Sequence, residues 1–84
     1  MQKFKLDKNG IDYIKFLVND KSNQKLRNRL RDLHYADIAE ILSKISTEDG
    51  TYLIKLLDSE KTADALAELD EDIRENIIEN LSVK

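Results

Sequence analysis

Carboxylates are the side chains of this sequence with the clearest capacity for chemistry. Glu60, Asp64 and Glu68 recur at every fourth residue, so a helix over this segment would place them on one face. Three like charges on one face repel one another unless something neutralises them. Lys55 and Lys61, or solvent, could do so; alternatively the face helps to hold a hard divalent cation such as Mg²⁺. Because Mg²⁺ keeps most of its waters and takes only one or two carboxylates from a surface, its affinity there would be weak.

Other chemistries find little support in the sequence. The chain has no cysteine, which excludes disulfides and thiolate metal sites and is typical of a reducing compartment. The two glycines, Gly10 and Gly50, stand too far apart to form a phosphate-binding loop. The lone histidine, His34, is expected in a turn, where its ring could accept a hydrogen bond from a helix-start amide. The sequence therefore predicts that the chain is not an enzyme.

Charge is distributed unevenly along the chain. Residues 1–35 carry nine Lys/Arg and four Asp/Glu, whereas residues 36–84 carry five and thirteen. This asymmetry fits either ordinary solvated helix faces or an acidic half that meets a cation or a basic partner. The basic residues form no dense stripe with interleaved aromatics, so no nucleic-acid binding is predicted. No apolar run approaches the roughly 20 residues that span a bilayer, so no direct membrane insertion is predicted.

A twelve-residue rhythm organises the second half of the chain. Three apolar registers repeat at this spacing: Leu33, Ile45, Leu57, Leu69 and Leu81; Leu30, Leu42, Ile54, Leu66 and Ile78; and Ile41, Leu53, Ala65 and Ile77. The residues that follow the members of the first register are His34, Ser46, Asp58, Asp70 and Ser82, and four of these five can cap a helix through a short side-chain oxygen. Each unit thus predicts a cap, a first turn and an apolar helical stripe.

These units predict an all-α fold of short helical repeats, about 12 residues per helix, stacked into a compact superhelix. We expect one domain over residues 1–84, with residues 1–8 either frayed or packed through Phe4 and Leu6. Asn9 could cap the first helix, and a second helix is predicted from Gln24 to Leu33. Gly50 falls inside a predicted helix, which indicates either a close helix contact or a local weakness.

The order of these motifs resembles a known family. The stretch Leu33–Glu40 reads Leu-His-Tyr-Ala-Asp-Ile-Ala-Glu, which is similar to the Leu-His-Pro-Ala-Asp-Ile-Ala-Glu signature of MgtE-type magnesium transporters. The segments Leu56–Asp64 and Leu69–Arg74 resemble the following parts of the cytosolic N-terminal domain in that family. Tyr35 and Ser59 stand where the family has proline. The resemblance extends over about residues 10–82.

The resemblance implies a superhelical regulatory domain at the cytoplasmic face of the cell membrane. In the full-length protein it would be followed by paired CBS domains and a transmembrane pore, within a homodimer. Bound Mg²⁺ would bridge acidic surfaces of the N and CBS domains and hold the pore closed. Asp64 matches a family position that offers a carboxylate to this interface, and Glu60 and Glu68 share its face. The family's N domain usually runs longer, so we expect a truncated domain with further acidic ligands beyond Lys84.

An alternative function belongs to a different class. Similar short helical repeats occur in flagellar motor-switch proteins and in helical-repeat adaptors. A module of that kind would bind a partner helix in a groove and would not respond to magnesium.

Overall fold

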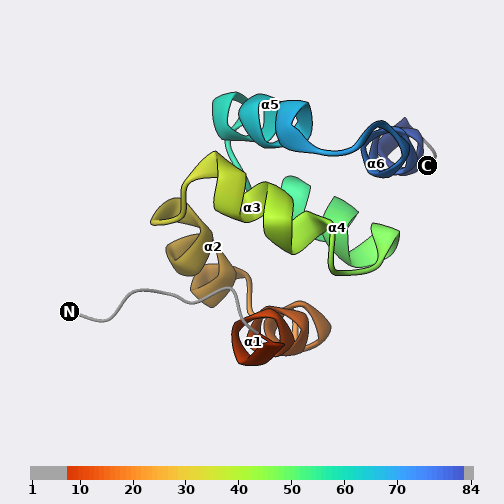
Figure 1. Ribbon diagram of the computed structural model, residues 1–84. Helices are drawn as coiled ribbons and strands as arrows, with labels where there is room; N and C mark the ends of the chain where they lie inside the picture. Colours follow the sequence, from red (N-terminus) through yellow and green to blue (C-terminus); the bar gives the residue numbers. More distant parts are fainter. Residues whose placement is uncertain (1–7, 83–84) are drawn as a thin grey trace.

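Six α-helices joined by short turns make up the described part of the chain, residues 8–82 of a computed structural model (Figure 1). They are α1 (Lys8–Asn19), α2 (Asn23–Arg31), α3 (Tyr35–Leu42), α4 (Thr47–Ile54), α5 (Ser59–Glu68) and α6 (Glu71–Ser82). Residues 8–82 contain no strand, so the predicted all-α class is confirmed. Within the same range no helix has both the length and the apolar character needed to cross a membrane. The predictions for Phe4 and Leu6 lie outside the described residues.

Predicted capping residues begin α3, α4 and α5. The side chains of His34, Ser46 and Asp58 each accept a hydrogen bond from a backbone amide of the first turn. These bonds run from Ala36 N to His34 Nδ1 (3.2 Å), from Asp49 N to Ser46 Oγ (3.1 Å) and from Lys61 N to Asp58 Oδ1 (2.7 Å). The turn role predicted for His34 is therefore confirmed. Tyr35 and Ser59 are the first residues of their helices, a position at which proline is also well tolerated.

We expect Asp58→Ala to lower the free energy of unfolding by about 0.5–2 kcal/mol, since it leaves an amide of the first turn of α5 without its acceptor. Asp58→Asn is the control, because asparagine keeps the acceptor oxygen and removes the charge. Urea denaturation followed by circular dichroism would measure the free energy of unfolding of both variants. Equal losses in the two variants would show that the charge stabilises α5, and that the hydrogen bond contributes little.

Two predicted helix boundaries are wrong, and a third is untested. Asn9 lies inside α1, which begins at Lys8, because the helix extends back beyond the apolar stripe that starts at Ile11. Ser82 is the last residue of α6, and its hydroxyl donates to the Ile78 carbonyl at 3.1 Å; the helix that Ser82 is predicted to cap lies outside the described residues. The second helix is predicted to end at Leu33, but α2 ends at Arg31. Leu33 lies in the turn that follows and is still buried.

The helices pack mainly on the next helix but one. α3 lies against α5 and α4 lies against α6, while α1 contacts both α2 and α4 (Figure 1). The turns between consecutive helices are short, and α3 and α4 each pack chiefly on the helix after the next, whereas α1 and α2 pack on each other. This alternation agrees with a stack of short helical repeats. The Cα atoms extend over 37 × 24 × 23 Å.

One of the three predicted registers forms the centre of the repeat. Its members are between 0% and 1% exposed, one in each of the last four helices: Ile41, Leu53, Ala65 and Ile77. Further residues of α1, α2 and α3 complete the fully buried core: Ile14, Leu17, Leu26, Leu30, Ile38 and Leu42. The register beginning at Leu30 becomes more exposed along the chain and reaches 45% exposure at Ile78, over which no described helix packs.

A buried polar link fastens α4 to α6. The Asn80 side-chain amide donates to Thr51 Oγ1 at 2.9 Å, and the Thr51 hydroxyl donates to the Thr47 carbonyl at 2.8 Å. Thr51 is 5% exposed, so these bonds satisfy a hydroxyl that burial would otherwise leave without partners. The link fixes the relative position of two helices that are distant in sequence.

Candidate metal-binding face

Helix α5 carries the predicted carboxylates and is fixed by contacts on its opposite side. Ala65, which is fully buried, lies in the helix where α5 packs on α3. α5 lies at the edge of the helix stack with α3 beneath it, and its outer side is open (Figure 1). The Asp58 cap fixes the start of the helix, and buried Leu69 ends it. Side chains on the outer side of α5 therefore face solvent, as the exposure of the three predicted carboxylates shows.

The three predicted residues are all exposed on α5. Glu60, Asp64 and Glu68 recur at every fourth position of the helix, so their side chains share a face. None of the three has an ion pair or side-chain hydrogen bond within residues 8–82. Their separations of about 6 Å along the axis leave the charges close enough to repel, by about 0.7 kcal/mol per neighbouring pair in water.

The lysine next to these carboxylates points elsewhere. The Lys61 ammonium donates to the carbonyls of Leu30 and Arg31, at 3.3 and 2.9 Å, and so caps the C-terminal end of α2. This placement is favourable because the C-terminal end of a helix carries partial negative charge. Lys55 is exposed and has no ion pair with the described part of the chain. Of the alternatives for neutralising the face, solvent and a bound cation remain.

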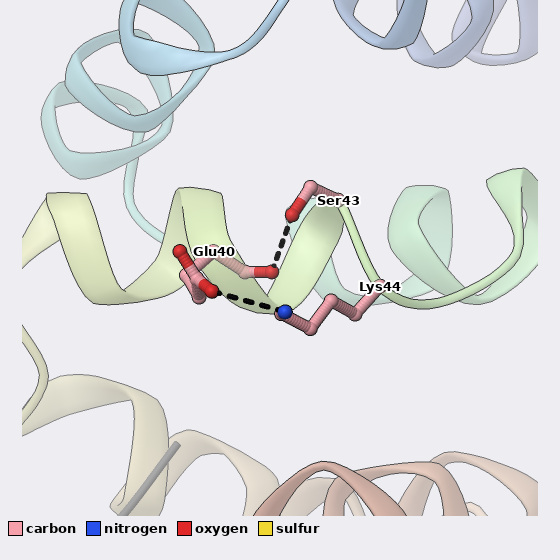
Figure 2. Close-up of polar contacts among 3 residues, drawn as sticks. All are labelled: Glu40, Ser43 and Lys44. Carbon is pink, nitrogen blue, oxygen red and sulfur yellow. Dashed lines mark hydrogen bonds and ion pairs between the residues drawn. The ribbon is translucent and has the colours of Figure 1, made fainter. Parts of the chain in front are cut away.

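Glu40 on α3 provides a contrast. Its carboxylate pairs with the Lys44 ammonium four residues later, at 3.2 Å, and its carbonyl accepts a hydrogen bond from the Ser43 hydroxyl at 2.7 Å (Figure 2). An acid with a lysine at this spacing is thus neutralised within the chain. The α5 carboxylates have no such lysine, because the residues four positions on from Glu60 and Asp64 are themselves acids.

The spacing of the α5 carboxylates limits how they can bind a metal. Glu60 and Glu68 lie about 12 Å apart along the helix axis, whereas Mg²⁺ binds its ligand oxygens at about 2.0–2.1 Å. One ion therefore cannot take all three side chains. Accordingly, residues 8–82 contain no group of three histidine, aspartate or glutamate side chains arranged to hold a metal. The face can supply one or two ligands, and the others must come from water or from a second surface.

The acidic character continues into the next helix. Asp70, Glu71 and Asp72 are exposed at the start of α6, and they follow Glu68 after a short turn. Acids in a first turn are favourable because the N-terminal end of a helix carries partial positive charge. These residues extend the negative surface beyond α5, as the sequence indicated.

Sequence reasoning missed a cationic pocket on α2 and α5, which Arg27, Arg31 and Lys61 help to line. A signal was present: α2 contains four cationic residues and no acid, with Arg27 and Arg31 four positions apart. That spacing places both guanidinium groups on one face. The contribution of Lys61 had no local signal, because its partners lie 30 residues earlier in the chain.

Comparison with known protein families identifies a related domain. A family model described as the MgtE intracellular N domain matches residues 33–84, which is more than half of the chain. The matched region contains α3 to α6 and all of the predicted metal ligands. It begins later than the expected start near residue 10, so α1 and α2 lie outside it although they share its core. No curated protein and no solved structure matches the chain.

Proposed function

This chain belongs to the MgtE intracellular N domain family, the regulatory N-terminal domain of magnesium transporters, and on that premise we propose that it senses Mg²⁺ through the acidic face of α5. The family is not an enzymatic one. One observation carries the proposal: Glu60, Asp64 and Glu68 share an exposed face with no cation from the described part of the chain. The match favours this function over the motor-switch-like scaffold.

Charge repulsion supplies the proposed mechanism. The α5 carboxylates face a second acidic surface, which we assign to CBS domains of the same full-length protein. At low Mg²⁺ the two surfaces repel and separate. At high Mg²⁺ hydrated ions bridge them, because Mg²⁺ can take one or two carboxylates from each side and keep its remaining waters. The bridged arrangement holds the transmembrane pore closed at the cytoplasmic face of the membrane, in a homodimeric transporter.

Weak affinity suits this role. A site shared between two surfaces forms only when both are present, so each surface alone binds the ion less well than the pair does. Asp64 occupies the middle of the row, with an acidic neighbour on either side. It is therefore the residue whose loss should reduce the local negative charge density most.

The test is a magnesium titration of the full-length transporter that carries this domain. We expect Asp64→Asn to raise the Mg²⁺ concentration at the midpoint of compaction by about two- to fivefold, since the loss of one exposed charge costs about 0.4–1 kcal/mol. Protease protection of the cytosolic part would report compaction, and chelation of Mg²⁺ should reverse it. Glu48→Gln is the matched control, because Glu48 is an exposed carboxylate on α4, outside the α5 face.

Compaction of the Asp64→Asn protein at the parent's Mg²⁺ concentration would show that Asp64 is not a ligand. A shift of the same size in Glu48→Gln would show that only total charge matters. Neither result would affect membership of the family, which rests on the match over residues 33–84.

A further inference from the structure

A pocket of about 250 Å³ lies where the C-terminal end of α2 meets the turn that leads into α5. Its apolar lining comes from Leu30 of α2 and from Leu56 and Leu57 of the turn. Leu30 is 1% exposed, while the two leucines of the turn are half-buried. The pocket thus offers accessible apolar surface on a chain whose other large apolar side chains are mostly buried.

Cationic side chains surround this apolar lining. Arg27, Arg31 and Lys61 line the pocket together with one carboxylate, that of Asp58, so cations exceed acids by two (three minus one). The Asp58 carboxylate is already occupied by the amide that it caps, at 2.7 Å. The pocket is therefore electropositive, although the chain as a whole carries a net charge of -3.

The two arginines retain most of their donors. A guanidinium group has five N–H donors, and Arg31 uses one on the Asn28 side chain at 3.2 Å. Arg27 has no partner within residues 8–82. Lys61 is held in place by the carbonyls of Leu30 and Arg31, which fixes one wall of the pocket. Two exposed guanidinium groups four positions apart on one helix can hold a single carboxylate between them.

The combination of lining and charge selects the kind of occupant. A free phosphate would lose hydration against the three leucines without gaining hydrogen bonds from them. A glutamate side chain suits the pocket better, because it carries a carboxylate on an aliphatic stem, and a neighbouring leucine of the same segment can cover the apolar lining.

We propose that this pocket is a docking site for an acidic, leucine-containing peptide segment, with a glutamate carboxylate held by Arg27 and Arg31. The site lies apart from the acidic face of α5 and needs no metal, because its own cations attract the segment directly. The proposal is independent of magnesium sensing.

The experiment titrates the ¹⁵N-labelled chain with a synthetic helical peptide of about 15 residues that presents glutamate and leucine on one face. A chelator is present throughout, so that no metal bridge contributes. We expect amide shifts centred on residues 27–32 and 56–61. Arg27→Gln with Arg31→Gln should weaken binding about tenfold, and added salt should weaken it further. Lys15→Gln with Lys25→Gln is the matched control; both lysines are exposed and line no part of the pocket, so affinity should stay within about twofold.

Several results would overturn the proposal. These are absence of binding, shifts centred elsewhere, equal binding by a peptide with glutamine in place of glutamate, or equal affinity in the Arg27/Arg31 variant. Inorganic phosphate is titrated separately. If it produces the same shifts and displaces the peptide, the pocket is a small-anion site and the peptide assignment is wrong.

Discussion

Ile77→Ala is expected to lower the free energy of unfolding by about 2–5 kcal/mol. Ile77 is 1% exposed and belongs to the register that lies at the centre of every repeat. Its side chain fills the space between α6 and α4, where Gly50 brings the backbone close. Truncation leaves a cavity that the surrounding helices can close only in part. Because a domain of this size has about 4–13 kcal/mol of stability in total, the loss would be a large fraction of it.

The adjacent residue supplies a matched control. Ile78 has the same side chain in the same helix, and it is 45% exposed. We expect Ile78→Ala to change the free energy of unfolding by less than about 1 kcal/mol, since little burial is lost and alanine favours the helix. Urea denaturation followed by circular dichroism compares the two directly. Equal losses would mean that α6 is rotated about its axis, so that Ile77 and Ile78 are buried to a similar extent.

The same pair of residues shows what the twelve-residue pattern could predict. Ile77 and Ile78 belong to two apolar registers that look equivalent in the sequence. The twelve-residue period identifies which residues form the apolar stripe of each helix. Whether a stripe is buried depends on whether another helix packs over it. Ile41 and Leu53 are fully buried, whereas Ile78 is 45% exposed and no described helix packs over it. The repeat was therefore predictable, and the exposure of its last unit was not.

Caps were predictable because they are local. His34 and Asp58 each contact an amide two or three residues later, a relation that the sequence itself contains. Lys61 shows the opposite case. Its position beside Glu60 and Asp64 suggested neutralisation of the acidic face, but its partners are carbonyls of α2. Only the packing of α5 brings those carbonyls within its reach.

The shared face of the three carboxylates could likewise be predicted, because it too depends only on local spacing. Four-residue spacing was enough to place Glu60, Asp64 and Glu68 on one exposed face, because they belong to one helix. The pairing of α3 with α5, which leaves that face open, depends on contacts between helices distant in sequence. Any ligands from a second surface lie outside what this sequence can indicate. The geometry of α5 therefore defines half of the proposed magnesium site.

The arrangement of the helices gives the two proposed surfaces a common support. α5 carries the acidic face on its outer side, and Lys61 in its first turn joins the same helix to the cationic pocket. A segment docked in the pocket would thus contact the helix that carries the candidate metal ligands. The Asp58 cap and the contact of Lys61 with the Leu30 carbonyl both lie at the start of α5, so the same end of this helix is tied to the core beneath both surfaces.

Gly50→Val is expected to lower the free energy of unfolding by about 1–3 kcal/mol through overpacking. A Cβ atom at Gly50 would lie 3.3 Å from Leu42 Cδ2 and 3.5 Å from Ile77 Cδ1, so the glycine marks a close contact of α4 with both α3 and α6. The two further methyl groups of valine would have to displace these buried side chains. Of the two explanations that the sequence left open, close contact is the one that the structure supports.

A graded series separates this explanation from local weakness of α4. Gly50→Ala should change stability by less than about 1 kcal/mol, since the helix propensity gained, about 1 kcal/mol, offsets a small displacement of Leu42. Combining Gly50→Val with Ile77→Val removes the Cδ1 atom and should recover part of the loss, with a coupling energy of about 0.5–3 kcal/mol. Two results in urea denaturation would show that Gly50 does not serve to make space for its neighbours. One is that the effects of Gly50→Val and Ile77→Val on the free energy of unfolding are additive, and the other is that Gly50→Val stabilises the chain. Recovery of stability in the double variant would instead show that Gly50 allows α6 to approach α4 closely. The last repeat of the stack depends on this contact.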